Sequence, residues 1–143
     1  MGDSELSTLV RLQEDERQVR NLIARLAHLA DYGDLDEYMT LFTEDAVWQW
    51  RDVRNEGAAA ILADRVMRRE SGGQGPGTGT RHVNTTLYVE VDGSDTATAH
   101  SYWIFVHDGE PRPTIHSLGR YRDTLVRTAT GWKVSHRHSI VTD

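Results

Sequence analysis

Cysteine is absent from the 143-residue chain. Without it the protein can form no disulfide, no thiolate nucleophile and no cysteine-based zinc site. We expect a cytoplasmic protein, because disulfides are typical of oxidising compartments. The length fits a single domain over residues 1–143 that can bury a sizeable core.

The chain also lacks a basic excess and a long apolar run. Its formal net charge is −6, whereas a phosphate-binding surface needs a basic excess, so we expect no nucleic-acid partner. No apolar stretch approaches the roughly 20 residues of a membrane span, and the polar start, MGDSELSTLV, is unlike a signal peptide. We therefore expect no membrane partner. Arg65, Arg68 and Arg69 lie close together, and we expect them to form a solvated helix face.

Several motifs of nucleotide-binding and hydrolytic proteins are missing as well. The glycine-rich run SGGQGPGTG (71–79) contains no G-x-G-x-x-G and follows a predicted helix, so the dinucleotide fingerprint is absent. The chain has neither the G-K-[ST] of a P-loop nor a G-x-S-x-G elbow. We interpret the run as a mobile loop, which could act as a lid on a cavity.

Apolar residues at helical spacing predict a first helix over residues 8–32. Asp34 and Glu37 have the pattern of a capping box, so a second, short helix should run from there to about Phe42. A third helix is predicted at about 57–69.

The rest of the chain has the pattern of β-strands. We predict strands at 46–50, 81–91, 95–107, 114–127 and 132–141. The N-terminal helices are the only available cover for the apolar face of such a sheet. The prediction is an α+β fold, a cone-shaped barrel in which a curved antiparallel sheet wraps around these helices. Such a fold tends to leave a cavity for a small molecule.

One carboxylate stands out on the first predicted helix. Asp31 continues the stripe of Ile23 and Ala27, so an acid ends an apolar helix face. A carboxylate there costs free energy unless it has a partner, and a strand histidine across the cavity would supply one. The alternative is a frayed helix end at which Asp31 faces water.

Histidine is the default proton carrier near neutral pH, although a strand histidine is more often a surface or core residue. His136 and His138 share one strand face and could begin a metal site with His116 or His107, but no carboxylate neighbour is fixed, and we expect no metal. Aromatic residues could wall a pocket for a flat apolar ligand. The candidates for substrate binding are Tyr32, Trp48, Trp50, Tyr102, Trp103 and Phe105.

Three segments carry a family resemblance: LADYGDLDEYMTLFTEDAVW, TRHVNTTLYVE and GWKVSHRHS. Their order and spacing resemble the SnoaL-like group of the nuclear transport factor 2-like superfamily. This group includes scytalone dehydratase, a hexachlorocyclohexane dehydrochlorinase and bile-acid dehydratases. The resemblance covers about residues 8–141. It implies a lyase or isomerase without metal or organic cofactor, a small, mostly apolar cyclic substrate, and a homo-oligomer (dimer or trimer).

The resemblance also implies site residues. In those lyases an aspartate at the end of the first helix pairs with a histidine at the start of the second strand, and Asp31 and His82 match these positions. A second histidine in scytalone dehydratase corresponds to His107, and an arginine on the last strand of the other enzymes corresponds to Arg137. Trp50 stands where scytalone dehydratase has a tyrosine, so the substrate should differ.

The implied chemistry is proton transfer. Asp31 would accept a hydrogen bond from one imidazole nitrogen of His82, and the other nitrogen could remove a proton beside a carbonyl or another activating group. Loss of a leaving group would make the protein a lyase, return of the proton elsewhere an isomerase, and ring closure a cyclase. Arg137 or a tyrosine could stabilise the oxyanion. The alternative is a non-catalytic ligand binder, or a small structural subunit such as those of ring-hydroxylating dioxygenases.

Strand alternation opposes this arrangement at two positions. His82 lies on the face opposite Val83 and Leu87, and Arg137 lies on the face opposite Val134. If the apolar face covers the helices, His82 and Arg137 point away from them. A β-bulge would restore the geometry. Alternatively, the apolar face packs against another subunit.

Overall fold

The computed structural model describes residues 1–141. Two helices, two strands and a third helix make up the first half of the chain, and only strands follow. The elements are α1 (Asp3–Tyr32), α2 (Leu35–Met39), β1 (Phe42–Trp50), β2 (Val53–Glu56), α3 (Ala58–Glu70), β3 (Thr80–Val91), β4 (Thr96–His107), β5 (Thr114–Thr128) and β6 (Gly131–Ile140).

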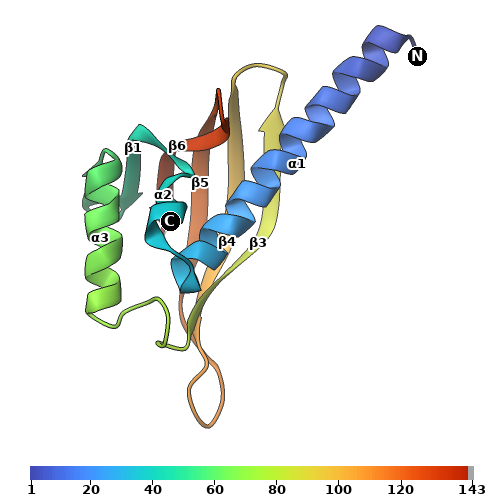
Figure 1. The fold of residues 1–143 in the computed structure, drawn as a ribbon. Coiled ribbons are helices and arrows are strands. Elements are labelled where there is room, and N and C mark those ends of the chain that lie inside the picture. Colours follow the sequence, from blue (N-terminus) through green and yellow to red (C-terminus); the bar gives the residue numbers. More distant parts are fainter. Residues whose placement is uncertain (142–143) are drawn as a thin grey trace.

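The strands form one sheet in the order β2-β1-β6-β5-β4-β3, with the helices on one face of it (Figure 1). The predicted α+β class, with a curved sheet around the N-terminal helices, is confirmed. The sheet is mixed rather than wholly antiparallel, because β1 lies parallel to β6. It is also open, with β2 and β3 as its edges, and β2 was not predicted.

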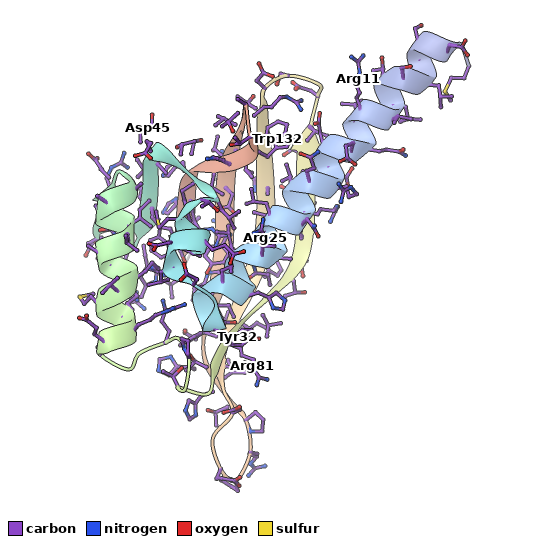
Figure 2. All side chains as sticks on the ribbon, in the orientation of Figure 1. Arg11, Arg25, Tyr32, Asp45, Arg81 and Trp132 are labelled. Atoms are coloured by element: carbon purple, nitrogen blue, oxygen red, sulfur yellow. The ribbon has the colours of Figure 1, made fainter. Side chains whose placement is uncertain are left out.

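The ends of two elements differ from the sequence prediction. α1 begins at Asp3, and its first turns extend past the sheet, with Arg11 on this projecting part (Figure 2). The second helix ends at Met39, and Phe42 opens β1 instead of closing that helix. Asp34 caps α2 as predicted, because its carboxylate accepts a hydrogen bond from the backbone N–H of Glu37 at 3.0 Å.

The core lies between α1 and the sheet. α1 contacts β3, and α3 contacts β1 at the other end of the layer. Val19 and Ile23 of α1, Ile61 of α3, and Leu125 and Val134 of the sheet are at most 1% exposed. Burial of such side chains is the main source of stability in a fold of this kind.

β3 contains a bulge that resolves the alternation problem. Its pairing with β4 shifts by one residue between Thr85 and Tyr88, and Thr86 has a positive φ of 52°. His82 before the bulge and Leu87 after it therefore both face the helices, whereas Val83 is exposed. Of the two alternatives, the bulge is the one that the structure contains.

β6 contains a second bulge with the same effect. Its pairing with β5 shifts between Thr124 and Leu125, so that Ser135 is the extra residue. Val134 and Arg137 are consequently both buried, at 0% and 4% exposed. Both bulges lie where the inner face of the sheet changes between apolar and polar residues.

The outer face of the sheet carries several exposed apolar side chains: Val83, Tyr88, Tyr102, Ile115 and Leu118. The homo-oligomer stays a prediction.

No helix within residues 1–141 is long and apolar enough to cross a membrane.

Candidate active site

Asp31 and His82 form a tight pair between the end of α1 and the start of β3. Asp31 is 3% exposed. Its Oδ1 lies 2.6 Å from His82 Nδ1, and its Oδ2 accepts the backbone N–H of His82 at 2.9 Å. The predicted carboxylate–histidine contact is thus present, and the alternative of a frayed helix end facing water is wrong.

This contact fixes the form of the imidazole. A charged carboxylate can only accept hydrogen bonds, so His82 Nδ1 must carry the hydrogen that it shares with Asp31. In neutral His82 the lone pair is then on Nε2, the nitrogen directed away from Asp31. The backbone bond from His82 holds the carboxylate in place, so the pair is held at both the ring and the main chain.

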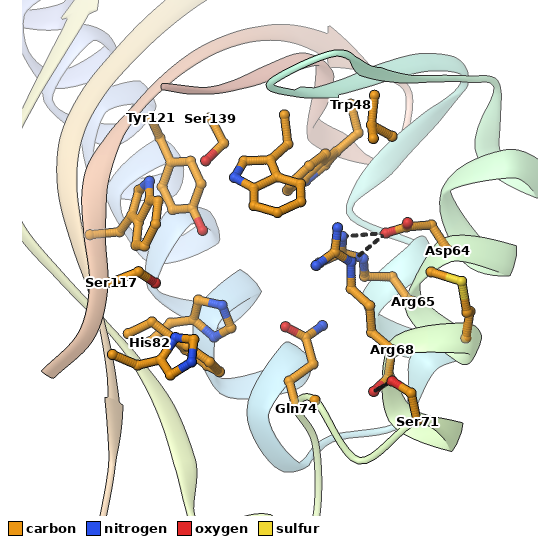
Figure 3. Close-up of a pocket in the computed structure, with 17 residues that line it drawn as sticks. Trp48, Asp64, Arg65, Arg68, Ser71, Gln74, His82, Ser117, Tyr121 and Ser139 are labelled. Carbon is orange, nitrogen blue, oxygen red and sulfur yellow. Dashed lines mark hydrogen bonds and ion pairs between the residues drawn. The ribbon is translucent and has the colours of Figure 1, made fainter. Parts of the chain in front are cut away.

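His82 forms part of the wall of a pocket of about 530 Å³ between the sheet and α3 (Figure 3). Four of the six predicted aromatic residues line it: Trp48, Trp50, Trp103 and Phe105. The rest of the wall is largely polar, and aromatic faces combined with convergent polar groups are typical of a small-molecule site.

Three predicted site residues are exposed and lie outside this pocket. Tyr32 and Tyr102 are each 54% exposed. Tyr102 alternates with the buried Trp103 and so points to the outer face, and Tyr32 comes one residue after Asp31, on another side of α1. His107 is exposed at the end of β4.

Another histidine, His116, lines the pocket instead. The pairing of β4 with β5 shifts between Phe105 and Val106, which leaves His116 as an extra residue of β5. Its ring stands edge-on to Phe105, with 5.7 Å between the ring centroids. A bulge of this kind has no clear signal in the sequence, so His116 entered the prediction only as a metal candidate.

Arg137 lies behind the main pocket. Its guanidinium donates two hydrogen bonds to Asp123, at 2.8 and 3.0 Å, and stacks 3.8 Å from the Tyr121 ring. Burial lowers the pKa of Arg137, but the charge and hydrogen bonds of Asp123 outweigh this effect and raise it above the usual value. Together with His82 it borders a chamber of only about 10 Å³.

Tyr121 borders both the chamber and the main pocket. Burial raises the pKa of its phenol to about 12, although the positive charge of Arg137 acts in the opposite direction. Tyr121 therefore keeps its proton at neutral pH and can donate a hydrogen bond. Sequence reasoning missed this residue because its position depends on how β5 pairs with its neighbours.

α3 supplies a charged wall to the pocket. Arg65 is 5% exposed, so the predicted solvated arginine face is wrong at this position. Arg65 and Arg68 both bond to Asp64, and Arg69 donates to the carbonyl of Leu29 at 2.9 Å. Burial raises the pKa of Asp64, but the two arginines outweigh this effect and lower it. The sequence signal that could have revealed this charged wall is the grouping of Asp64, Arg65 and Arg68 within about one turn of the predicted helix.

The predicted strand histidines do not gather around a metal position. Within residues 1–141 no three histidine, aspartate or glutamate side chains lie close enough to hold a metal ion. His136 Nε2 instead contacts Gln49 Oε1 at 2.5 Å, on the sheet face opposite Arg137. Burial lowers the pKa of His136, and the positive charge of Arg54 lowers it further.

The chain resembles known proteins in sequence and in fold. Residues 11–138 match the family model of the SnoaL-like domain. A nuclear transport factor 2-like protein with a cystatin-like fold from Novosphingobium aromaticivorans is 29% identical, with a TM-score of 0.86 over 99% of this chain and 91% of that one. No significant match is found among the curated protein sequences.

Two further structures from the same organism are similar. One, provisionally named an aromatic ring hydroxylase, is 25% identical, with a TM-score of 0.70 over 91% of this chain and 90% of that one. The other, provisionally named a scytalone dehydratase, is 19% identical, with a TM-score of 0.67 over 100% of this chain and 89% of that one, and shares the fold. The chain belongs to the SnoaL-like family of the nuclear transport factor 2-like superfamily.

Proposed function

We propose that the protein is a cofactor-independent lyase of the dehydratase type, or an isomerase, acting on a small, mostly apolar cyclic substrate. The observation that carries this proposal is the 2.6 Å contact between Asp31 Oδ1 and His82 Nδ1 in the wall of the pocket. Asp31 and His82 act as a general acid/base pair.

The first step is removal of a proton from carbon. His82 Nε2 takes the proton from a carbon beside a carbonyl, and the C–H electron pair moves toward the carbonyl oxygen to give an enolate. Asp31 stabilises the imidazolium that forms. The imidazolium then gives its proton to a departing hydroxide, which leaves as water, or to another carbon of the substrate. General-base catalysis of this kind contributes about 10²- to 10⁴-fold to the rate.

The pocket walls suit a flat ring. Trp48, Trp103 and Phe105 offer aromatic faces and edges, which favour stacked or edge-on contact with an unsaturated or aromatic substrate.

A non-catalytic role is the rival proposal, and the structural likeness to a protein provisionally named an aromatic ring hydroxylase supports it. A ligand binder or structural subunit, however, has no need of a carboxylate that is 3% exposed beside an imidazole in a pocket wall. Burying such a charge is costly, so its presence favours a use for it. The enzyme remains the better explanation of the Asp31–His82 pair.

Hydrogen–deuterium exchange tests the proposed step directly, because every proposed reaction begins with loss of the same proton. Cyclohexanone, 1-tetralone and 2-tetralone are incubated with the protein in D₂O, and exchange beside the carbonyl is followed by NMR. The wild type should accelerate exchange for at least one ketone, and His82→Gln should lose about 10²- to 10⁴-fold of that rate.

The matched control is His138→Gln, on the sheet face opposite Arg137, which should exchange at the wild-type rate. Circular dichroism checks that both variants keep the fold. No acceleration with any of the three ketones, or equal rates for His82→Gln and the wild type, would overturn the proposal.

A further inference from the structure

Arg65 combines burial, charge and an unused donor in the pocket wall. It is 5% exposed and borders both the main pocket and the small chamber behind it. One terminal nitrogen bonds to Asp64, and the guanidinium stacks 4.5 Å above the Trp48 ring. Its Nε has no hydrogen-bond partner among residues 1–141.

Arg65 is not the only donor left without a partner there. The indole nitrogens of Trp48 and Trp103, which also line the pocket, are buried without a partner among the described residues. Arginine and indole N–H groups can donate but not accept. A molecule that occupies this pocket and satisfies these groups must therefore supply acceptor oxygens.

The charges are separated across the pocket. Figure 3 shows His82 on one side and Arg65 with Arg68 on the other. Arg65, Arg68 and Asp64 together leave one positive charge on the α3 side, whereas Asp31 supplies a negative charge behind His82. This polarity favours a substrate whose proton leaves toward His82 while negative charge accumulates toward α3.

We infer that Arg65 binds the substrate oxygen on which negative charge develops, and that the substrate is a cyclic ketone whose acidic C–H lies beside the carbonyl or beside a C=C bond conjugated with it. The C–H bond breaks, the proton goes to His82 Nε2, and the electron pair is delocalised onto the oxygen held by Arg65. The catalytic role rests on the proposed function, but the binding of a ring-borne oxyanion can be measured without turnover.

Neighbouring arginines are less suited to this role. Arg137 donates two hydrogen bonds to Asp123 and borders only the chamber. Arg68 is more exposed, at 25% of its side chain, and donates its Nε to Asp64 at 2.9 Å. Of the two arginines that line the main pocket, Arg65 and Arg68, Arg65 is the more buried.

Binding of 4-nitrophenolate provides the test, because this planar ring carries a delocalised oxyanion like that of an enolate. Its neutral counterpart is 4-nitroanisole, in which a methyl group caps the same oxygen. At pH 8.5 the wild type should bind 4-nitrophenolate about 10- to 100-fold more tightly than 4-nitroanisole, as expected for a hydrogen bond to a charged group. Arg65→Met should remove most of this preference, and Arg65→Lys should restore part of it.

The matched control is Arg25→Met, which removes the same charge from a half-exposed ion pair with Glu37 on the surface. It should keep the preference for the anion. Equal preference in Arg65→Met and the wild type would overturn the inference, as would loss of the preference in Arg68→Met alone. If Arg65→Met does not fold, the wild type still decides, because equal affinity for the two ligands contradicts an oxyanion site.

The outcomes separate this inference from the proposed function. His82→Gln should keep the preference for 4-nitrophenolate while it loses ketone exchange. Loss of exchange in His82→Gln together with wild-type anion binding in Arg65→Met would overturn only the role of Arg65. Normal exchange in His82→Gln together with weak anion binding in Arg65→Met would overturn only the proposed acid/base pair.

Discussion

The Asp31 carboxylate holds His82 twice, at the ring through Nδ1 at 2.6 Å and at the main chain through the backbone N–H at 2.9 Å. The ring bond selects the tautomer, and the main-chain bond places the carboxylate where it can do so. A single side chain at the end of α1 thus sets both the position and the protonation pattern of the base on β3.

Asp31→Asn should uncouple these two effects. The amide oxygen can still accept the backbone N–H of His82, but the amide group can donate to Nδ1 and so favour the tautomer in which Nε2 is protonated. We expect ketone exchange to fall by about 10²- to 10⁴-fold, with an unchanged circular dichroism spectrum. Asp36→Asn, on the exposed side of α2, is the control, and an equal loss in both variants would contradict this explanation.

Thr86 should be replaceable by glycine with a gain in stability. Its φ of 52° lies in the left-handed region, which is unfavourable for a β-branched residue and open to glycine. Relief of this strain outweighs the extra chain entropy of glycine, and the free energy of unfolding should rise by up to about 1 kcal/mol. Urea denaturation measures it. Thr85→Gly, one residue earlier in the same strand, should instead lower stability, and the same sign for both changes would argue against strain at Thr86.

Ionisation of Tyr121 should make the stability of the fold depend on pH only in the alkaline range. Its phenol has a pKa of about 12 in the folded protein against an ordinary value of 10.0, so folding favours the protonated form. The stability that this group contributes is fully present below pH 10 and is lost as the pH rises toward 12. The midpoint temperature of thermal unfolding should therefore fall less steeply between pH 8 and 12 for Tyr121→Phe than for the wild type. Parallel curves would contradict the raised pKa.

Breaking the Arg137–Asp123 pair should be costly. Asp123 is 0% exposed, so Arg137→Met leaves an uncompensated buried charge, which costs about 3–5 kcal/mol. The double variant Arg137→Met, Asp123→Leu should recover most of this loss in urea denaturation. Arg20→Met, which breaks the exposed pair with Glu16, should cost less than about 1 kcal/mol. A double variant as unstable as Arg137→Met would contradict the pairing explanation.

The sequence was informative where a pattern spans several residues. Helical spacing located α1 closely enough to bring Asp31 to its end, and the family pattern pointed to His82 as its partner. The alternation conflict at His82 and Arg137 indicated either a bulge or an apolar contact with another subunit. The positions of the bulges, at Thr86 and Ser135, could not be predicted, because neither residue is a glycine. The burial of Arg65 depends on Trp48 of another element, and only the folded chain brings the two together.

The two bulges divide the inner surface of the sheet into a part that lines the pocket and a part that packs in the core. In β3 the residues before the bulge include His82, and those after it include Leu87, which packs on the core. In β6 the order is reversed, with Val134 in the core before the bulge and Ser139 at the pocket after it. In each strand the change between pocket lining and core packing therefore occurs at the bulge. A substitution on the pocket side of the bulge can alter which ligands the cavity accepts without disturbing the side chains that pack against α1.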